Sequence, residues 1–436
     1  MQAVILAGGK GTRLRSRLGD LPKPMVDVSG KPLLERQIEL LRAHGFDNVL
    51  LLLGYNPGKI TEYFGDGSSR GVRIQSVVEP APLGSAGAVL AAFDRLEERF
   101  LVLYGDTMLN VDLRHFASVH ASKKVDASLF VHPNDHPHDS DLVEVDASGR
   151  ILAFHSYPHS AGQNYANLVN AALYVIEKQA LRPWLELQPP FDFAKDLFPV
   201  MVKAGQNLFG YRSREYIKDV GTPERLERVE KDLDSGRIAR SSFETPAPAV
   251  FLDRDGTINE EVNRVWEPSQ FKLLPGVGPA IRRLNRSGYV VVVITNQAVI
   301  ARGDCTEETL QQIHNKMETE LGQAGAYVDA IYYCPHHPDR GFPGERVELK
   351  IACTCRKPET GLLEAACRDM NLDLASSWVI GDSGRDIEMA KRAGVRSILV
   401  ETGHPVTSGT SGRGPDHQAP SLTEAVDFLL GGKANQ

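Results

Sequence analysis

The chain alternates short runs of apolar residues, which predict buried strands, with longer segments whose apolar residues follow helical spacing. Runs of the first kind are AVILA (3–7), NVLLLL (48–53), VRIQSVV (72–78), RFLVLY (99–104), FL (251–252) and VVVVIT (290–295). Segments of the second kind cover 32–44, where Gly45 gives the stop signal, 222–236 and 306–322. Alternation of strands with helices predicts α/β folds.

The length and a change of composition in the middle of the chain predict two domains. A chain of 436 residues is longer than one hydrophobic core normally serves. After the helical pattern of 222–236 comes RIARSSFETPAPAV (237–250), which is rich in Ser, Pro and Ala and has no sustained periodicity. We therefore expect a first domain over 1–236, a linker over 237–248 that its prolines stiffen, and a second domain over 249–432.

Composition and charge narrow the class of protein. Apolar residues make up 42% of the chain and charged residues 24%, as in an ordinary soluble globular protein. The net charge of −7 does not favour nucleic acid as a partner. No apolar run approaches the roughly 20 residues that span a bilayer, and the start, MQAVILAGGKGTRL, lacks the basic region and cleavage site of a signal peptide. We expect a cytoplasmic protein with no nucleic-acid or membrane partner, and homo-oligomer formation stays open.

A glycine-rich loop, Gly8 to Leu14, follows the first apolar run, and Lys23 lies further on in a Pro-Lys-Pro sequence. Glycines let backbone N–H groups approach a phosphate chain closely. Lys10, Arg13 and Lys23 would add positive charge, and the prolines would stiffen the segment around Lys23. The pattern predicts a site for a phosphorylated ligand.

Two carboxylates follow strand-like runs in the same half of the chain. Asp106 comes after RFLVLYG, and Asp219 comes after YIK. Oxygens at the C-terminal end of a strand are ligands that suit Mg²⁺. Nearby in the predicted site, Gly84, Ser85 and Gly87 begin a helix; they leave room for a flat ring or a phosphate, or else form a tightly packed turn.

Over nearly all of residues 1–232 these motifs resemble the sugar-1-phosphate nucleotidylyltransferases, including the D-glycero-D-manno-heptose 1-phosphate guanylyltransferases. The matching sequences are LAGGKGTRL, PKPM, EPAPLGSAGA, LYGDTML and KDVGTPERL. The resemblance implies a Rossmann-like fold with a mixed sheet, Mg²⁺ at Asp106 and Asp219, and catalytic roles for Arg13 and for Lys23, which would stabilise charge on the α-phosphate. It assigns nucleotide binding to Leu6, Ala7, Gly8, Gly9, Gly11, Thr12, Glu79, Gly84 and Ser85.

One stretch departs from that family. Its members carry Phe-x-Glu-Lys-Pro, with the lysine on the sugar phosphate, where this chain has FHSYP (154–158). The later Asn-x-Gly pattern is NAA (170–172). Lys218, or His155 together with His159, is a candidate replacement for the missing lysine; alternatively, both histidines belong to a solvated loop.

The second half opens on FLDRDGTIN (251–259), in which two aspartates are placed two residues apart. Residues so spaced on an extended segment point the same way, so a strand would deliver Asp253 and Asp255 to one spot at its C-terminal end. Two close carboxylates repel each other unless a cation or a proton is shared between them. A nucleophile and a general acid beside Mg²⁺ satisfy that condition.

Later segments supply further polar groups for such a site. They are Thr295 and Asn296 after VVVVI, Arg302 in IARG, Lys357 in CRKP, and Asp382 and Asp386 in GDSGRD. A hydroxyl and an amide can hold a phosphoryl oxygen, a lysine neutralises developing negative charge, and carboxylates at a strand end bind Mg²⁺. We expect Asp386 in the first turn of a helix, close to Asp382 in space.

All five cysteines lie in the second half, and this odd number argues against a disulfide framework. Cys334 and His336 form one closely spaced pair, and Cys353 and Cys355 form another. Three sulfurs and an imidazole are a closed tetrahedral set for Zn²⁺, so the ion would be structural. His337 is the rival of His336, and the C-x-H spacing favours His336.

These motifs resemble the haloacid-dehalogenase-type phosphatases over about 246–430: DRDGT, a threonine after an apolar strand, a lysine, and GDxxxD. The sequences TNQ, IARG, CPHHP and CTCRKP narrow the resemblance to the D-glycero-D-manno-heptose 1,7-bisphosphate phosphatases, which share the zinc loop with histidinol-phosphate phosphatases. Ala298-Val299 departs from the more usual Ser-Gly. The resemblance implies a second Rossmann-like domain, with a zinc-pinned loop.

The same resemblance assigns the catalytic roles. Asp253 would be the nucleophile, Asp255 the general acid/base, and Thr295 and Lys357 would hold the phosphoryl group. It further implies Mg²⁺ held by Asp253, the carbonyl of Asp255 and Asp382, substrate contacts from Asn296, Arg302 and Arg356, and Zn²⁺ held by Cys334, His336, Cys353 and Cys355.

Together the two halves predict a bifunctional enzyme of nucleotide-activated heptose synthesis. Its phosphatase would remove the 7-phosphate from heptose 1,7-bisphosphate, and its nucleotidyltransferase would join a nucleotidyl group from GTP to heptose 1-phosphate and release pyrophosphate. One alternative keeps both chemistries but uses other substrates, such as a hexose 1-phosphate or histidinol phosphate. Another makes the first domain a non-catalytic sensor of a nucleotide sugar.

Overall fold

The computed structural model describes residues 1–160, 162–341, 343–404 and 414–431, and it divides into two compact units. The first unit consists of 1–132, 141–157 and 169–243, and the second of 133–140, 158–168 and the chain from 244 onward. Two short segments from the first half of the sequence therefore belong to the second unit. Among the residues described, no helix is long and apolar enough to cross a membrane.

A mixed sheet of nine strands forms the centre of the first unit. Its strands are β1 (Gln2–Ala7), β4 (Asn48–Leu53), β5 (Arg73–Val78), β6 (Arg99–Tyr104), β8 (Ala127–His132), β9 (Leu142–Val145), β10 (Ile151–His155), β11 (Val169–Glu177) and β12 (Leu208–Arg212). The main path runs β10-β9-β11-β6-β1-β4-β5, with β8 beside β11 and β12 beside β8. The apolar runs of the N-terminal part form the parallel strands β1, β4, β5 and β6, and β11 is antiparallel to β6, so the predicted mixed sheet is confirmed.

Smaller elements complete this unit. Two two-stranded ribbons pair β2 (Asp27–Val28) with β3 (Lys31–Pro32) and β7 (Thr107–Asn110) with β13 (Tyr216–Asp219). The helices are α1 (Arg15–Leu18), α2 (Leu33–Ala43), α3 (Pro57–Phe64), α4 (Ser85–Ala91), α5 (Leu113–Lys123), α6 (Lys178–Leu181), α7 (Phe198–Lys203), α8 (Pro223–Asp234) and α9 (Arg237–Arg240). Leu34, Ile38 and Leu41 of α2 share a buried core with Ile5 of β1, as the helical spacing predicted.

A fully parallel sheet of six strands forms the centre of the second unit, in the order β16-β15-β14-β17-β18-β19. These strands are β14 (Ala247–Leu252), β15 (Val290–Asn296), β16 (Ala330–Cys334), β17 (Leu372–Gly381), β18 (Arg396–Val400) and β19 (His417–Ala419). Val250 and Leu252 lie in one core cluster, and Ala249 and Phe251 lie in another. The strand reads as continuously apolar because both faces of the sheet are buried.

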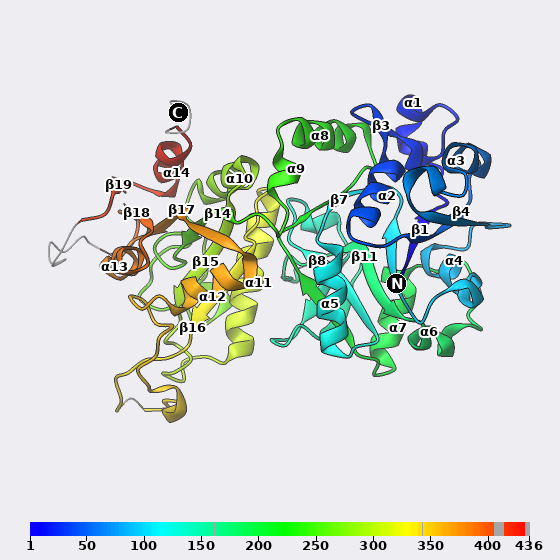
Figure 1. Cartoon of the computed structure of the whole chain (residues 1–436). Helices are drawn as coiled ribbons and strands as arrows, with labels where there is room; N and C mark the ends of the chain where they lie inside the picture. The colour runs from blue at the N-terminus through cyan, green and yellow to red at the C-terminus, as the bar shows by residue number, and fades with distance from the viewer. Residues whose placement is uncertain (161, 342, 405–413, 432–436) are drawn as a thin grey trace. The chain divides into compact units, whose positions relative to one another are not determined.

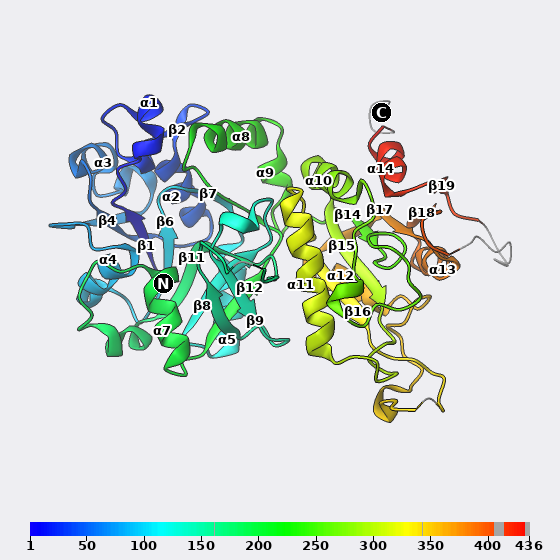
Figure 2. The same ribbon diagram turned by 180° about the vertical axis from the view of Figure 1, so that it is seen from behind.

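Helices cover both faces of this second sheet. They are α10 (Val277–Ser287), α11 (Glu307–Gln323), α12 (Gly361–Met370), α13 (Gly384–Ala393) and α14 (Leu422–Gly431). The opposite views of Figures 1 and 2 show α12 and α13 on one face and α10 and α11 on the other. Helix α11 also contacts the segment 133–140: a Cβ on Gly322 would lie 2.4 Å from the ring of Pro137.

The segment 237–248, expected to be a linker, contains two regular elements. It holds the short helix α9 and the start of β14 at Ala247. The strand begins there because the N–H of Ala247 donates to the carbonyl of Asn371 and Pro248 pairs with Asp373. The irregular connection is thus limited to 241–246.

Candidate active sites

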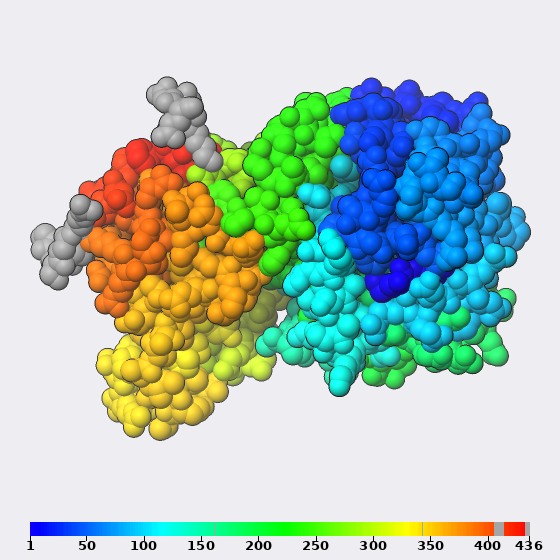
Figure 3. All heavy atoms as spheres, viewed as in Figure 1, coloured from blue at the N-terminus to red at the C-terminus, as the bar shows by residue number. Residues whose placement is uncertain are grey.

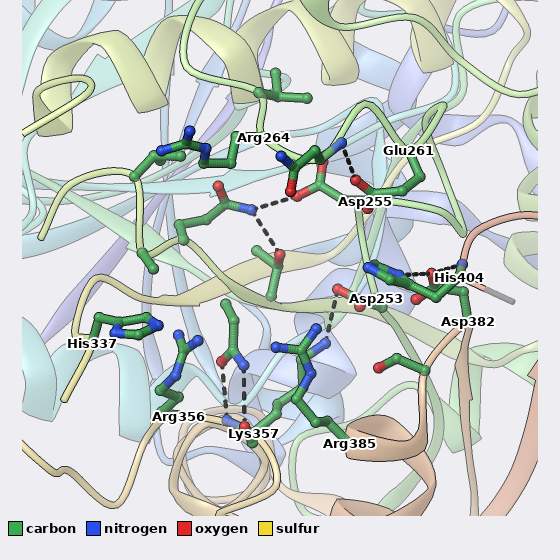
Figure 4. Close-up of a pocket in the computed structure, with 18 of the residues that line it drawn as sticks. Asp253, Asp255, Glu261, Arg264, His337, Arg356, Lys357, Asp382, Arg385 and His404 are labelled. Carbon is green, nitrogen blue, oxygen red and sulfur yellow. Dashed lines mark hydrogen bonds and ion pairs between the residues drawn. The ribbon is translucent and has the colours of Figure 1, made fainter. Parts of the chain in front are cut away.

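The carboxyl ends of β14, β15 and β17 meet around a polar cavity of ≈ 230 Å³ in the second unit, where an open α/β sheet places its ligands (Figure 4). Asp253 directly follows β14, Thr295 and Asn296 end β15, and Asp382 directly follows β17. All eight residues predicted for catalysis, Mg²⁺ and substrate in this half line the cavity: Asp253, Asp255, Thr295, Asn296, Arg302, Arg356, Lys357 and Asp382.

Lys357 is buried among carboxylates at the base of this cavity. Its Nζ lies 2.8 Å from Oδ1 of Asp253 and 2.6 Å from Oδ1 of Asp386, and it donates to the carbonyl of Ile294. Burial favours the neutral amine, but the two carboxylates outweigh it and raise the pKa of Lys357. Burial, together with the charges of Asp386 and Asp382, raises the pKa of Asp253 to about 7. Lys357 therefore stays protonated beside these carboxylates.

Three carboxylates form a set that suits Mg²⁺. Asp253, Asp382 and Asp386 each offer an oxygen, and these oxygens lie within 4.8 Å of one another. The charges of Asp386 and Asp382 help to raise the pKa of Asp253, and a divalent cation among the three carboxylates would relieve that repulsion. Asp386 also accepts hydrogen bonds from the N–H and hydroxyl of Ser383 at the start of α13, so its expected place in that first turn is confirmed.

Asp255 faces a different set of partners from Asp253. Its carboxylate accepts from Arg254 at 2.9 Å, from Asn259 at 3.0 Å and from Gln297 at 2.9 Å. Burial opposes its ionisation, but the charge of Arg254 and these hydrogen bonds hold the pKa of Asp255 below its usual range. β14 ends before Asp253, so the two aspartates do not lie on one extended strand as expected, but both still line the same cavity at its carboxyl end.

The turn after Asp255 requires a glycine. Gly256 has φ 78°, and a Cβ on it would lie 2.4 Å from a carboxylate oxygen of Asp382. Only glycine at this position therefore lets the turn after Asp255 pass this close to the carboxylate of Asp382. The same carboxylate of Asp382 accepts from the N–H of His404 and lies 2.8 Å from its Nδ1.

Several residues that line this cavity or hydrogen-bond to Asp255 were not among the predicted site residues. Arg254, Asn259 and Gln297 stand inside or beside the motifs DRDGTIN and TNQ, so their positions in the sequence were a usable signal. Glu261 and His404, which with Asp382 form a second group of close ligand atoms, carry no such signal.

The four predicted zinc ligands come together. The sulfur of Cys355 lies 3.2 Å from that of Cys334 and 3.3 Å from that of Cys353, and Nδ1 of His336 lies 3.2 Å from Cys355 Sγ. A regular tetrahedron with Zn–S bonds of about 2.3 Å places sulfurs about 3.8 Å apart, so the set needs only slight expansion to hold the ion. The segment that follows Cys334, coloured yellow to gold, lies at the surface in Figure 3.

His337, the rival ligand, lies apart from the sulfurs. Its side chain is buried and lines the cavity that holds Asp253, whereas His336 belongs to the cysteine cluster. The spacing argument for His336 thus agrees with the geometry.

A larger cavity, of ≈ 520 Å³, lies in the first unit. Eight of the predicted residues line it: Leu6, Gly8, Gly9, Lys23, Glu79, Gly84, Ser85 and Asp106. Five others are not among its lining residues: Ala7, Gly11, Thr12, Arg13 and Asp219. Lys10, Tyr55, Asn56 and Tyr104 line the cavity without having been assigned a nucleotide-binding role.

Cations pair with both predicted Mg²⁺ ligands in this unit. Lys23 Nζ contacts the carboxylate of Asp106, and Arg225 Nη1 lies 2.7 and 2.6 Å from the two oxygens of Asp219. A Cβ on Gly221 would lie 2.7 Å from Asp219, 3.5 Å from Arg13 Nη2 and 3.8 Å from Lys23 Nζ. The side chains of Asp219, Arg13 and Lys23 therefore all lie close to Gly221.

The segment at Gly84 and Ser85 forms a tightly packed turn. Gly84 has φ 76°, and a Cβ there would lie 2.3 Å from the carbonyl oxygen of Phe191. The hydroxyl of Ser85 donates to Asp192 at 2.8 Å and accepts from the N–H of Phe193. This hydroxyl is thus committed to the protein, although Ser85 still lines the cavity.

The candidates for the missing sugar-phosphate lysine lie outside the cavity. Lys218, His155 and His159 are not among its lining residues. His155 Nε2 lies 3.1 Å from Glu144, and His159 Nε2 lies 2.8 Å from the carbonyl oxygen of Ser140. No replacement for that lysine emerges from these contacts.

Known protein families match the chain in two parts. The nucleotidyl transferase family matches residues 2–236, and the HAD-hydrolase-like family matches 354–425. The D-glycero-β-D-manno-heptose-1,7-bisphosphate 7-phosphatase of Escherichia coli K12 is 38% identical over 189 residues, which are 43% of this chain and 91% of that protein. The enzyme of the same name from Yersinia pestis is 42% identical over 162 residues, 37% of this chain and 84% of that protein.

Solved structures also resemble the two parts separately. HddC from Yersinia pseudotuberculosis has 27% identity and a TM-score of 0.46, and the match covers 53% of this chain and 99% of HddC. The D,D-heptose 1,7-bisphosphate phosphatase from B. bronchiseptica, complexed with magnesium and phosphate, has 37% identity and a TM-score of 0.38, and the match covers 42% of this chain and 99% of that one.

Proposed function

Since the chain belongs to the nucleotidyl transferase family over residues 2–236 and to the D-glycero-β-D-manno-heptose-1,7-bisphosphate 7-phosphatase family in its second half, we propose that it catalyses two successive steps of nucleotide-activated heptose synthesis. The observation that carries the proposal is the presence of both sites in one chain, one built around Lys357 and Asp253 and the other around Lys23 and Asp106. The product of the first step is the substrate of the second.

In the phosphatase step, Asp253 attacks the 7-phosphate of heptose 1,7-bisphosphate and becomes phosphorylated, while the sugar oxygen leaves with a proton that Asp255, ionised in the free chain, would take from the bound phosphate and pass on. Water then releases phosphate from Asp253. Lys357 and Thr295 neutralise and hold the transferred group. Mg²⁺, bound by Asp253, Asp382 and the carbonyl of Asp255, would supply further charge neutralisation, and Asp386 would orient Lys357.

In the transferase step, an oxygen of heptose 1-phosphate attacks the α-phosphorus of GTP, and pyrophosphate leaves. Positioning and charge neutralisation supply most of the catalysis in such a transfer. Lys23 and Arg13 neutralise the phosphates, and Asp106 and Asp219 would hold Mg²⁺. The cavity of ≈ 520 Å³ has a volume typical of small-molecule sites.

The nucleobase assignment rests on Glu79. Its carboxylate lines the cavity, and it can only accept hydrogen bonds. Guanine presents an N2 amino group beside its N1–H, so its edge offers adjacent donors to such a group. GTP therefore suits Glu79 better than a nucleotide whose edge alternates donors and acceptors.

The four-ligand cluster holds a structural Zn²⁺ in this proposal. Cys334, His336, Cys353 and Cys355 fill a tetrahedral shell and leave no position for a reacting water. The ion would fix the loop that carries His337 on one side and Arg356 and Lys357 on the other.

The test is to incubate the purified chain with heptose 1,7-bisphosphate, GTP and Mg²⁺, and to follow phosphate, pyrophosphate and GDP-heptose. We expect all three products from the native chain, no phosphate from Asp253→Asn, and no pyrophosphate from Asp106→Ala. Release of phosphate alone, whichever nucleotide is offered, would refute the transferase step. A faster reaction with histidinol phosphate or a hexose 1-phosphate would move the assignment to those substrates.

A further inference from the structure

One ring nitrogen of His337 is committed to the protein, and the ring lines the phosphatase cavity. The N–H of Asp339 donates to Nδ1 of His337 at 3.1 Å. Nδ1 therefore carries no proton, and a neutral ring holds its proton at Nε2. Among the residues that the structure describes, no hydrogen-bond partner is found for Nε2 of this buried side chain.

The turn that fixes this tautomer is itself anchored. Lys350 is buried, its Nζ donates to the carbonyl of Asp339 at 2.8 Å, and it lies 3.3 Å from a carboxylate oxygen of Glu345. The N–H of His337 donates to the carbonyl of Leu349 at 3.2 Å. The loop thus holds the ring in one orientation before a substrate binds.

Two arginines line the cavity together with His337. They are Arg302 and Arg356, and Nη1 of Arg356 is fixed by the carbonyl of His336 at 3.2 Å. In Figure 4, His337 and Arg356 lie on one side of Asp253, and Asp382 and His404 lie on the other. The cavity therefore has a metal-binding side rich in carboxylates and an opposite side where His337, Arg302 and Arg356 offer hydrogen-bond donors.

We propose that His337 is a substrate-binding residue that donates from Nε2 to the phosphate which the phosphatase leaves in place. This inference rests on the proposed function, in which the substrate carries two phosphates. The departing phosphate occupies the side of Asp253 and Lys357, so the retained phosphate reaches the donors of His337, Arg302 and Arg356. In a buried site, a hydrogen bond between a neutral donor and a charged acceptor discriminates strongly between a substrate that carries the acceptor and one that lacks it.

The test compares phosphate release from heptose 1,7-bisphosphate and from heptose 7-phosphate, which lacks the retained phosphate, using the full chain. The amide nitrogen of a glutamine can reach the position of Nε2, whereas that of an asparagine replaces Nδ1. We expect the ratio of the two kcat/KM values to fall by about 10-fold or more in His337→Asn and to be largely kept in His337→Gln. Zinc content, measured on each variant, shows whether the loop is intact, and His138→Asn, an exposed position, is the matched control.

The outcomes separate this inference from the proposed function. If the native chain prefers the bisphosphate and His337→Asn keeps that preference, the inference is overturned while the proposed function stands. An equal fall of the kcat/KM ratio in His337→Asn and His337→Gln also overturns it, because the donor that glutamine places at the position of Nε2 then does not contribute to substrate binding. If the native chain releases no phosphate from the bisphosphate, the proposed function fails, and the inference fails with it.

Discussion

The ammonium group of Lys357 lies 2.8 Å from a carboxylate oxygen of Asp253, and both groups are shielded from solvent at the ends of different strands or loops. Asp386 holds the same ammonium from the other side at 2.6 Å. A nucleophilic carboxylate thus has its counter-charge built in, at the place where a phosphoryl group would gain negative charge during transfer.

Replacement of Lys357 by methionine tests this pair, because methionine keeps most of the volume and removes the charge. We expect phosphate release to fall by about 10²–10³-fold, the usual cost of losing one charge-stabilising group. Pyrophosphate release from GTP and heptose 1-phosphate, measured on the same protein, is the control and should not change. Phosphatase activity near that of the native chain would contradict the role given to Lys357.

Loss of a zinc ligand should destabilise the second unit. We expect one zinc ion per chain by elemental analysis, and its loss in Cys353→Ser, since a closed set needs all four donors. The binding energy of structural zinc, about 10–16 kcal/mol in small domains, is comparable to the whole stability of a domain. Thermal unfolding and limited proteolysis of the loop 337–352 should report the change.

A matched control exists for that experiment. Cys367 lies in α12 outside the four-ligand cluster, so Cys367→Ser makes the same atomic exchange without touching the site. Equal zinc content and equal melting temperatures in the two variants would count against a structural ion.

Local patterns in the sequence were sufficient for the central strands and for most of the phosphatase site. β14 and β15 are continuous apolar runs because helices cover both faces of their sheet, and the groups at their ends are adjacent in sequence to those runs. The cysteine pairs were likewise informative because zinc requires a definite set of donors at short spacing.

Contacts that depend on packing had no local signal. Arg225 pairs with Asp219 across the start of α8, His404 reaches Asp382 from a distant loop, and Asp192 accepts from Ser85. The membership of segments 133–140 and 158–168 in the second unit also follows from tertiary contacts: the N–H of Tyr165 donates to the hydroxyl of Thr319 on α11. No periodicity in those segments predicts such contacts.

Selection of guanine by Glu79 can be measured with GTP and ITP, since the base of ITP lacks the amino group of guanine. We expect the native chain to prefer GTP, and Glu79→Gln to lower kcat/KM for GTP by about 10-fold or more, because a bidentate contact to a base contributes about 1–3 kcal/mol. A glutamine amide would turn a donor toward the donors of guanine. For the same reason, Glu79→Gln should prefer GTP over ITP less strongly than the native chain does.

Glu62→Gln serves as the control for that substitution, because Glu62 is exposed on α3 and is not among the residues that line the cavity. If Glu79→Gln and Glu62→Gln show the same ratio of GTP to ITP use, Glu79 does not read the base.

Acid should destabilise the second unit through His314. This histidine is fully buried on α11, and Nη1 of Arg254 lies 3.3 Å from its Nε2. Burial, followed by the charge of Arg254, lowers the pKa of His314 to about 3, against 6.5 in an unfolded chain. Below about pH 6.5 the unfolded chain therefore binds a proton that the folded chain refuses, so the free energy of unfolding falls as the pH falls toward the folded pKa.

His314→Gln removes this titration, and its comparison with the native chain isolates it from other acid-sensitive groups such as the zinc ligands. Between about pH 7.5 and about pH 5 the native chain should lose about 2 kcal/mol more stability than the variant. Denaturant unfolding in a Trp184→Phe background would report on the second unit, since Trp266 and Trp378 both lie there. Parallel pH profiles in the two proteins would contradict the prediction, because they would mean that the pKa of His314 is the same in the folded and unfolded chains.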